Sequence, residues 1–285
     1  MMSTIVANQQ HASLKRPVIA LLTDFGSGDG TVGVMKGVIT GITPGTQLID
    51  ITHEIAPQDV AAAAWILGSA YRYFPAGAVF VCVVDPGVGS ERRAIALHAG
   101  SWFFVGPDNG LFSGIIQEQP VHGAVELANP AYRLPQVSSS FHGRDIFAPT
   151  AAYLAANASE VFSKLGPALD PARLLTLPTR NAIRRGNTIE ASILHVDHFG
   201  NLITSIPLNM VPELFTAHHV QVTFPEQGVA INQRRRFFGD GADDGQPFLY
   251  RDSSGYLGIA VRNGSATRTL GRGAGTPIVF ETSAS

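Results

Sequence analysis

Apolar residues follow two different patterns along the chain. In the first half, short apolar runs at 18–22, 47–51 and 78–84 alternate with helical patterns at 31–42 and 59–73. Strands that alternate with helices are typical of a parallel sheet. We therefore expect a Rossmann-like α/β domain with a mostly parallel sheet. Two further apolar segments and a helix complete it, at 94–97, 102–105 and 145–156.

Beyond about residue 180, short apolar segments succeed one another with no long helix between them. They lie at 189–196, 202–206, 220–224, 257–261 and 278–280. This pattern predicts a small all-β domain, a barrel or a sandwich. The polar, glycine-rich stretch 232–246 indicates a mobile loop. The expected organisation is a disordered lead-in, an α/β domain and a β domain, at 1–16, 17–178 and 179–285.

Composition favours a small-molecule ligand over a macromolecular one. The chain has 285 residues, 45% of them hydrophobic, and a net charge of -2 without a long basic run. That balance argues against nucleic acid and against an anionic membrane as partners. The single Cys82 lies in an apolar run, which predicts a buried thiol and fits a reducing cytoplasm. We found neither a secretory signal nor an apolar run long enough to cross a membrane.

The segment after the third strand is the first candidate site. The apolar run 78–84 leads into Asp85, a proline–glycine turn and then Arg92 and Arg93. In open α/β sheets, ligands bind beyond the carboxyl ends of the strands, which is where Asp85 is expected to lie. The alternative is that Asp85 only opens a turn and that both arginines are solvated.

A glycine-rich loop follows the first strand and allows two interpretations. Gly28, Gly30 and Gly33 match the spacing of a dinucleotide-binding loop, with Asp50 as a possible ribose ligand. However, five residues separate the strand from the first of these glycines, whereas the dinucleotide loop closes at the strand end. Asp24 is better placed to accept hydrogen bonds from a sugar diol. Its alternative role is that of a helix N-cap.

Two further segments carry candidate chemistry. His142 stands in a serine-rich turn before the helix, where a histidine could handle a water proton, while Asp145 could cap the first helical turn. In the β domain, two histidines and an acid at 195–198 allow a metal site, although no second cluster completes a ligand set. Asp197 and Asn201 instead suit the amino and carboxylate groups of an amino-acid-like ligand.

Taken together, five motifs resemble the S-adenosylmethionine hydroxide adenosyltransferase family, which also includes fluorinases and chlorinases. They occur in order between about residue 17 and 282: Thr23-Asp24-Phe25-Gly26, Asp85-Pro86-Gly87-Val88-Gly89 with Arg92, Phe141-His142-Gly143-Arg144-Asp145, Asp197-His198-Phe199-Gly200-Asn201 and Ser253-Ser254-Gly255-Tyr256-Leu257. The ordered set is far more specific than any single motif.

The resemblance implies a C-terminal β-barrel and a homotrimer with active sites between subunits. It also implies hydrolysis of S-adenosylmethionine to adenosine and methionine, with no cofactor and no metal. By the family pattern the catalytic set is Asp85, Arg92 and His142. The substrate-binding set is Asp24 for the ribose hydroxyls, Phe199 packed on the ligand, Asp197, Asn201 and Ser253 for the methionine portion, together with Phe25 and Phe141.

The same resemblance favours a hydrolase over a halogenase. The halogenases carry tyrosine where this chain has Asp85 and His142, and an acid would repel a halide. Two departures from the fluorinase are Gln58 in place of a tryptophan and Ser254 in place of an arginine. The alternatives are a halogenase, a non-catalytic module that binds adenosine or S-adenosylmethionine, and a nicotinamide-dependent oxidoreductase.

Overall fold

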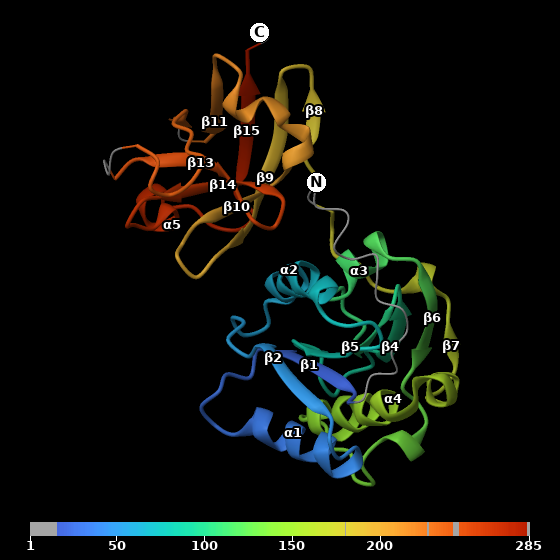
Figure 1. The fold of residues 1–285 in the computed structure, drawn as a ribbon. Coiled ribbons are helices and arrows are strands. Elements are labelled where there is room, and N and C mark those ends of the chain that lie inside the picture. The colour runs from blue at the N-terminus through green and yellow to red at the C-terminus, as the bar shows by residue number, and fades with distance from the viewer. Residues whose placement is uncertain (1–15, 180, 227, 242–244, 284–285) are drawn as a thin grey trace. The chain divides into compact units, whose positions relative to one another are not determined.

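The computed structural model describes residues 16–179, 181–226, 228–241 and 245–283 (Figure 1). The chain divides into two compact units between Leu177 and Pro178, and each is described by itself. The expected disordered lead-in lies outside the described residues except for Arg16.

The N-terminal unit contains a mixed seven-stranded sheet in the order β2-β1-β3-β5-β4-β6-β7. The first four strands in this order are parallel, whereas β4 runs antiparallel to β5 and β6, and β7 runs antiparallel to β6. The predicted parallel sheet therefore forms one half of a larger mixed sheet. The strands are β1 Val18–Thr23, β2 Gln47–Thr52, β3 Val79–Val83, β4 Ala94–Ala99, β5 Trp102–Pro107, β6 Val121–Glu126 and β7 Ala168–Leu169.

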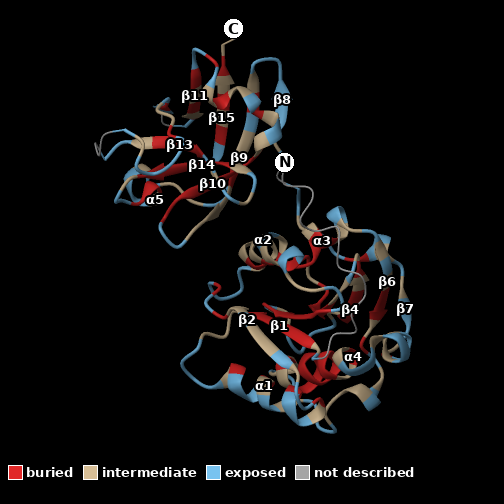
Figure 2. Ribbon diagram, viewed as in Figure 1, coloured by how far each residue is buried: buried red, intermediate tan, exposed pale blue. Residues whose placement is uncertain are grey.

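Helices cover both faces of this sheet (Figures 1 and 2). Helices α1 (Thr31–Ile42) and α4 (Ala148–Val161) pack on one face, and α2 (Val60–Ala70) and α3 (Ser113–Glu118) pack on the other. Because both faces are covered, β1 and β3 are buried at every position, as their apolar sequences predict for all residues except Thr23 at the end of β1. Burial raises the pKa of the Cys82 thiol, as expected for an inert cysteine.

Three helical segments differ from the sequence prediction. The helix expected over 145–156 begins as a π-helical turn at Gly143–Phe147 and continues through α4. The helix expected over 59–73 ends at Ala70 and is followed by a 3₁₀ turn. Helix α3 was not predicted, because six residues are too few to show a helical period.

The C-terminal unit is a barrel-like antiparallel sheet in the order β12-β11-β15-β9-β10-β14-β13, with β8 paired to β9. This arrangement agrees with the expected β-barrel class. The strands are β8 Ile183–Arg185, β9 Thr188–Val196, β10 Leu202–Pro207, β11 Val220–Phe224, β12 Val229–Ile231, β13 Pro247–Arg251, β14 Tyr256–Val261 and β15 Pro277–Thr282; the helix α5 is Ala266–Leu270.

Part of the stretch expected to be a mobile loop helps to close this barrel. The Arg235 amide donates to the Leu249 carbonyl at 2.9 Å, and the Leu249 amide donates to the Gln233 carbonyl at 2.8 Å. The chain after β12 therefore pairs with β13, so that the two ends of the sheet are joined. Residues 242–244 of this stretch lie outside the described residues. Within the described chain, no helix is both long and apolar enough to cross a bilayer.

Candidate active site

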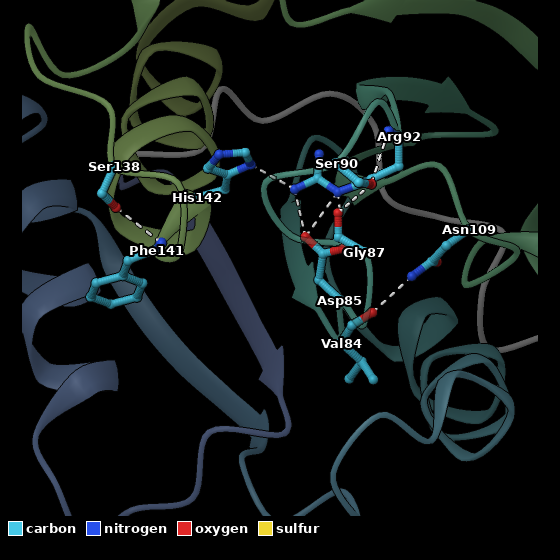
Figure 3. Close-up of polar contacts among 9 residues, drawn as sticks. All are labelled: Val84, Asp85, Gly87, Ser90, Arg92, Asn109, Ser138, Phe141 and His142. Atoms are coloured by element: carbon cyan, nitrogen blue, oxygen red, sulfur yellow. Dashed lines mark hydrogen bonds and ion pairs between the residues drawn. The ribbon is translucent and has the colours of Figure 1, made fainter.

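The turn after β3 places Asp85 at the carboxyl edge of the sheet. The Asn109 side-chain amide donates to the Val84 carbonyl at 2.8 Å, which fixes the end of the strand (Figure 3). Within the turn, the Ser90 hydroxyl donates to the Gly87 carbonyl at 2.7 Å. The Asp85 side chain is only 4% exposed. The turn therefore presents a nearly buried carboxylate.

Arg92 holds this carboxylate with a fork of hydrogen bonds. Its Nε lies 2.9 Å from both Asp85 oxygens, and its Nη2 lies 2.5 Å from Oδ2. The guanidinium also lies over the Phe147 ring, 5.3 Å from the centroid. Charge-assisted pairs of this geometry are short and directional. The alternative in which Asp85 only opens a turn and Arg92 is solvated is therefore wrong.

His142 extends the pair into a chain of three residues. Its ring points from the helical turn toward Arg92 (Figure 3), and Nδ1 lies 2.8 Å from Arg92 Nη2. A guanidinium has donors only, so Nδ1 must accept and the ring proton belongs on Nε2. Burial lowers the pKa of His142, and the Arg92 charge lowers it further against the opposing charges of Asp85 and Asp145. The imidazole is therefore neutral at neutral pH.

Asp145 shapes the turn that carries His142. Its buried carboxylate accepts hydrogen bonds from the Ser138 amide and hydroxyl, both at 2.8 Å, and from Arg144 Nε at 2.6 Å. The Ser138 hydroxyl in turn accepts the Phe141 amide at 3.0 Å. Burial opposes ionisation of Asp145, but the bonds from Arg144 and Ser138 outweigh it and lower the carboxyl pKa. Asp145 therefore organises the preceding turn and is not a helix cap.

The Asp85 turn and the His142 turn fit together at Gly89. Its φ is +78°, and a Cβ at this position would lie 2.3 Å from the Ser139 carbonyl oxygen. Any side chain here would be strained and would push the two turns apart. Gly89 thus permits the close approach that brings Arg92 to His142.

Asp24 lies at the end of β1 and accepts the Gln58 amide at 2.8 Å. The structure excludes it as the cap of α1, because the residue preceding that helix is Gly30. Gln58 has a φ of +68°, which is a strained conformation for a residue with a side chain. Strained residues of this kind cluster at active sites and ligand-binding sites. The backbone at Gln58 therefore orients the candidate ribose carboxylate.

The dinucleotide interpretation of this loop is wrong. Its third glycine should allow close packing of helix on strand, yet Gly33 is exposed and a Cβ there would touch nothing within 4 Å. Asp50, the expected ribose ligand, is instead paired with Lys36 at 2.6 Å.

The two candidate phenylalanines of the N-terminal unit lie next to each other. The rings of Phe25 and Phe141 meet edge to face with centroids 6.0 Å apart. A Cβ at Gly143 would lie 3.2 Å and 3.3 Å from atoms of these rings, so the absence of a side chain there lets them meet. Phe141 and His142 are neighbours, which links this aromatic pair to the Asp85–Arg92–His142 chain.

Sequence reasoning missed the role of Arg93. Its Nε donates to Asp108 at 2.9 Å, and its Nη2 donates to Asp108 and, at 2.8 Å, to the Arg173 carbonyl. Asp108 also accepts the Leu175 amide at 2.9 Å. The Arg93–Asp108 pair thus anchors the segment around residues 173–175, near the end of the N-terminal unit. An arginine followed fifteen residues later by an aspartate gives no local signal of such a pair.

In the C-terminal unit, Asp197 organises the turn between β9 and β10. Its Oδ1 accepts the Phe199 and Asn201 amides at 2.9 Å and 2.8 Å, and its Oδ2 accepts the Asn201 side chain at 2.7 Å. Asp197 thereby fixes the directions in which Phe199 and Asn201 leave the turn. No group of three or more metal-ligating side chains occurs among the described residues.

Phe199 and Asn201 line a pocket of about 690 Å³. Phe199 is 73% exposed and forms an open apolar wall, whereas Asn201 is buried. Ser253 is exposed in the turn after β13 and is not part of the lining. The pocket is completed by Phe238, Val261, Asn263, Gly264, Ser265, Arg268 and Thr269.

Known proteins resemble this chain over nearly its whole length. An (R)-S-adenosyl-L-methionine hydrolase from Salinispora tropica is 41% identical, over 90% of this chain and 94% of its own. A fluorinase from Actinoplanes is 27% identical, over 86% and 90%. The crystal structure of an uncharacterized conserved protein from Thermotoga maritima aligns with a TM-score of 0.84 at 34% identity, over 92% and 99%.

Family models match both units. The N-terminal domain model of SAM hydroxide adenosyltransferase matches residues 19–165, and the C-terminal domain model matches residues 191–279. The two matches include the turns of Asp85, His142 and Asp197. The chain therefore belongs to the SAM hydroxide adenosyltransferase family.

Proposed function

We propose that this protein hydrolyses S-adenosyl-L-methionine to adenosine and L-methionine. The observation that carries the proposal is the chain of contacts from Asp85 through Arg92 to His142, which joins a carboxylate, a fixed cation and a neutral imidazole. The 41% identity to a hydrolase of this substrate supports it. The lower identity of 27% to a fluorinase makes halogenation the less favoured activity.

In the proposed reaction, a water oxygen forms a bond to the ribose 5′ carbon. The bond from that carbon to the sulfonium sulfur breaks, and its electron pair goes to sulfur. Methionine then leaves as a neutral thioether, so no general acid is needed. The main task of the site is to hold one water in line with the breaking bond, and such positioning supplies a large part of many enzymatic rate enhancements.

Each of the three residues has a different role in activating that water. Arg92 carries a fixed positive charge that favours hydroxide character in the nucleophile. Asp85 holds the guanidinium in place through its fork of bonds. His142 takes the proton on Nδ1, the nitrogen that faces Arg92. The guanidinium and the water proton therefore compete for one lone pair, and proton transfer requires Arg92 to turn fully toward Asp85.

The same trio disfavours a halide as nucleophile. A halide would have to approach the Asp85 carboxylate as a full negative charge, whereas water arrives neutral and becomes negative only as its proton passes to His142. A halide also has no proton to give to His142. We propose that water is the nucleophile and that neither a cofactor nor a metal takes part.

For substrate binding we propose roles in both units. Asp24 accepts hydrogen bonds from the ribose hydroxyls, with Phe25 and Phe141 beside it. In the C-terminal unit, Phe199 packs on the ligand. Asp197, Asn201 and Ser253 hold the methionine portion, where Asp197 acts by orienting the turn.

We further propose a homotrimer in which each site combines residues of two neighbouring subunits. The expected mass is three times the chain mass of 30.2 kDa, measured by light scattering. Two inactive variants, Asp85→Asn and Asn201→Ala, should regain activity when refolded together, because some sites then receive both intact halves. Absence of regained activity in a confirmed mixed trimer would rule out shared sites.

The activity is tested by chromatography of purified protein incubated with S-adenosylmethionine. Equal amounts of adenosine and methionine are expected, also after chelator treatment and in the presence of chloride. Asp85→Asn should abolish turnover, whereas Glu91→Gln, the same change at an exposed position of the same turn, should not. Binding without products would indicate a binding module, and a halogenated nucleoside would indicate a halogenase.

A further inference from the structure

His53 occupies a buried position behind the loop that carries Asp24. It follows β2, and Thr23 ends β1; these strands are parallel neighbours, so their carboxyl ends meet. His53 is 8% exposed and Thr23 is fully buried. The Thr23 hydroxyl lies 2.9 Å from His53 Nδ1. Neither residue belongs to the candidate sets derived from the sequence.

The other ring nitrogen of His53 faces an acid. Nε2 lies 3.0 Å from Asp50 Oδ1, although its proton does not point straight at that oxygen. The second oxygen of Asp50 accepts Lys36 Nζ at 2.6 Å. Burial opposes the ionisation of Asp50, but the hydrogen bond from Lys36 and the nearby imidazole of His53 prevail and lower its pKa. The acid is therefore ionised and can only accept.

The contact between Thr23 and His53 links the imidazole to the loop. Thr23 Oγ1 lies 2.9 Å from His53 Nδ1 and also accepts the Phe25 amide at 3.3 Å. A hydroxyl can donate one hydrogen bond and accept two, so both contacts can be made at once. A chain of contacts thus runs from the Phe25 amide through Thr23 to the ring of His53, whose other nitrogen faces Asp50.

The backbone of His53 holds the same loop from a second side. Its carbonyl accepts the Gly26 amide at 2.8 Å. The amides of Phe25 and Gly26 are thereby both tied to His53, one through Thr23 and one directly. Asp24 lies between Thr23 and these two amides, and its carboxylate is held by the Gln58 amide at 2.8 Å. The position of the candidate ribose acceptor therefore depends on His53.

We propose that His53 is a positioning residue that sets the hydrogen-bonding geometry of Asp24 toward a ribose diol. It touches no substrate and acts through Thr23 and Gly26. The inference rests on the proposed function, because it needs a nucleoside at Asp24. It adds a determinant of sugar specificity outside the catalytic trio.

The test compares the binding of adenosine and 2′-deoxyadenosine by titration calorimetry. The wild type should prefer adenosine by about tenfold or more, the worth of one hydrogen bond to a charged acceptor. His53→Ala should reduce that preference by about fivefold, and kcat/KM should fall chiefly through KM. His53→Asn keeps a hydrogen-bonding amide near the position of Nδ1, which the Thr23 hydroxyl can meet as donor or acceptor, and should recover most of the preference.

Two further variants make the result decisive. Thr23→Val removes the hydroxyl at nearly constant volume and should reproduce the loss, even if His53→Ala folds poorly. Glu54→Gln changes an exposed acid of the same turn that accepts the Ser27 hydroxyl, and should leave the preference unchanged. Misfolding would lower the number of binding sites without altering the ratio of the two affinities.

The possible failures are distinguishable. No adenosine binding by the wild type would overturn the proposed function. A wild type that prefers adenosine, together with His53 and Thr23 variants that keep the full preference, would overturn the role of His53 alone.

Discussion

Replacement of Arg92 by lysine separates its charge from its geometry. Arg92 is only 10% exposed and contacts Asp85 and His142 at the same time. A lysine keeps the charge but has a single nitrogen, so it cannot form the fork with Asp85 and also donate to His142. At least one charge-assisted hydrogen bond is lost, worth about 1.5–3 kcal/mol. If that loss falls on the transition state, kcat drops by about 10- to 150-fold.

A second variant, Arg92→Met, removes the charge as well. The Arg92 charge lowers the pKa of His142, second only to burial, so its removal should raise that pKa. Because only neutral His142 can accept a proton, activity is lost as the pH falls through its pKa. The wild type should therefore keep activity below pH 6.5, the ordinary histidine value. In Arg92→Met this acid limb should move to higher pH, whereas in Arg92→Lys it should move less.

The assay is steady-state formation of adenosine across the pH range in which histidine titrates, with kcat and KM fitted separately. Denaturant unfolding of each variant provides the control for folding, because Arg92→Met leaves a buried carboxylate unpaired at a cost of about 3–5 kcal/mol. The proposed division of roles is refuted by an unchanged kcat in folded Arg92→Lys, or by an acid limb that stays in place in folded Arg92→Met.

Three further outcomes are expected. Asp145→Asn should lower the free energy of unfolding by about 2 kcal/mol and reduce kcat more than it raises KM, since a buried acceptor is lost; equal denaturation midpoints would contradict this. Gly89→Ala should cost at least about 1–2 kcal/mol from its left-handed backbone, measured by the same unfolding, whereas Gly28→Ala should be nearly neutral. Burial and the nearby His122 lower the pKa of His98 in the folded protein. Below pH 6.5 the unfolded chain therefore binds more protons than the folded one, so the free energy of unfolding should fall as the pH is lowered. His98→Gln should reduce this pH dependence, measured as the midpoint of urea unfolding.

The sequence predicted well the elements with a regular apolar pattern. Strand β3 is apolar at every position, β1 is apolar up to its last residue, Thr23, and α1 has the bounds expected from its helical period. Strand β6 has an alternating, partly polar sequence and lies near the sheet edge, so it gave no comparable signal. Strand β13 was not predicted, because it directly follows a polar loop; residues near the start of that loop pair with it.

The clearest candidate in the sequence was Asp85, a charged residue that directly follows a fully apolar run. Asp85 could be singled out in this way, and the structure then paired it with Arg92. The supporting residues could not be found, because Asp108 and Ser138 act on partners that only the fold brings near. His53 was hidden for the same reason, since its meeting with Thr23 depends on the pairing of two strands thirty residues apart.

The opposite partners of Arg92 and Arg93 make the register of β4 a determinant of the chemistry. Successive residues of an extended chain point to opposite sides, and Arg93 extends the β4–β5 ladder through the hydrogen bond from the Asp108 amide. A slip of one residue toward the preceding turn would place Arg93 where Arg92 now lies, facing Asp85. Ala94 would then lie opposite Asp108, and the anchor that Arg93 now forms there would be lost. Such a slip would thus change which arginine serves the reaction, while leaving both present in the sequence.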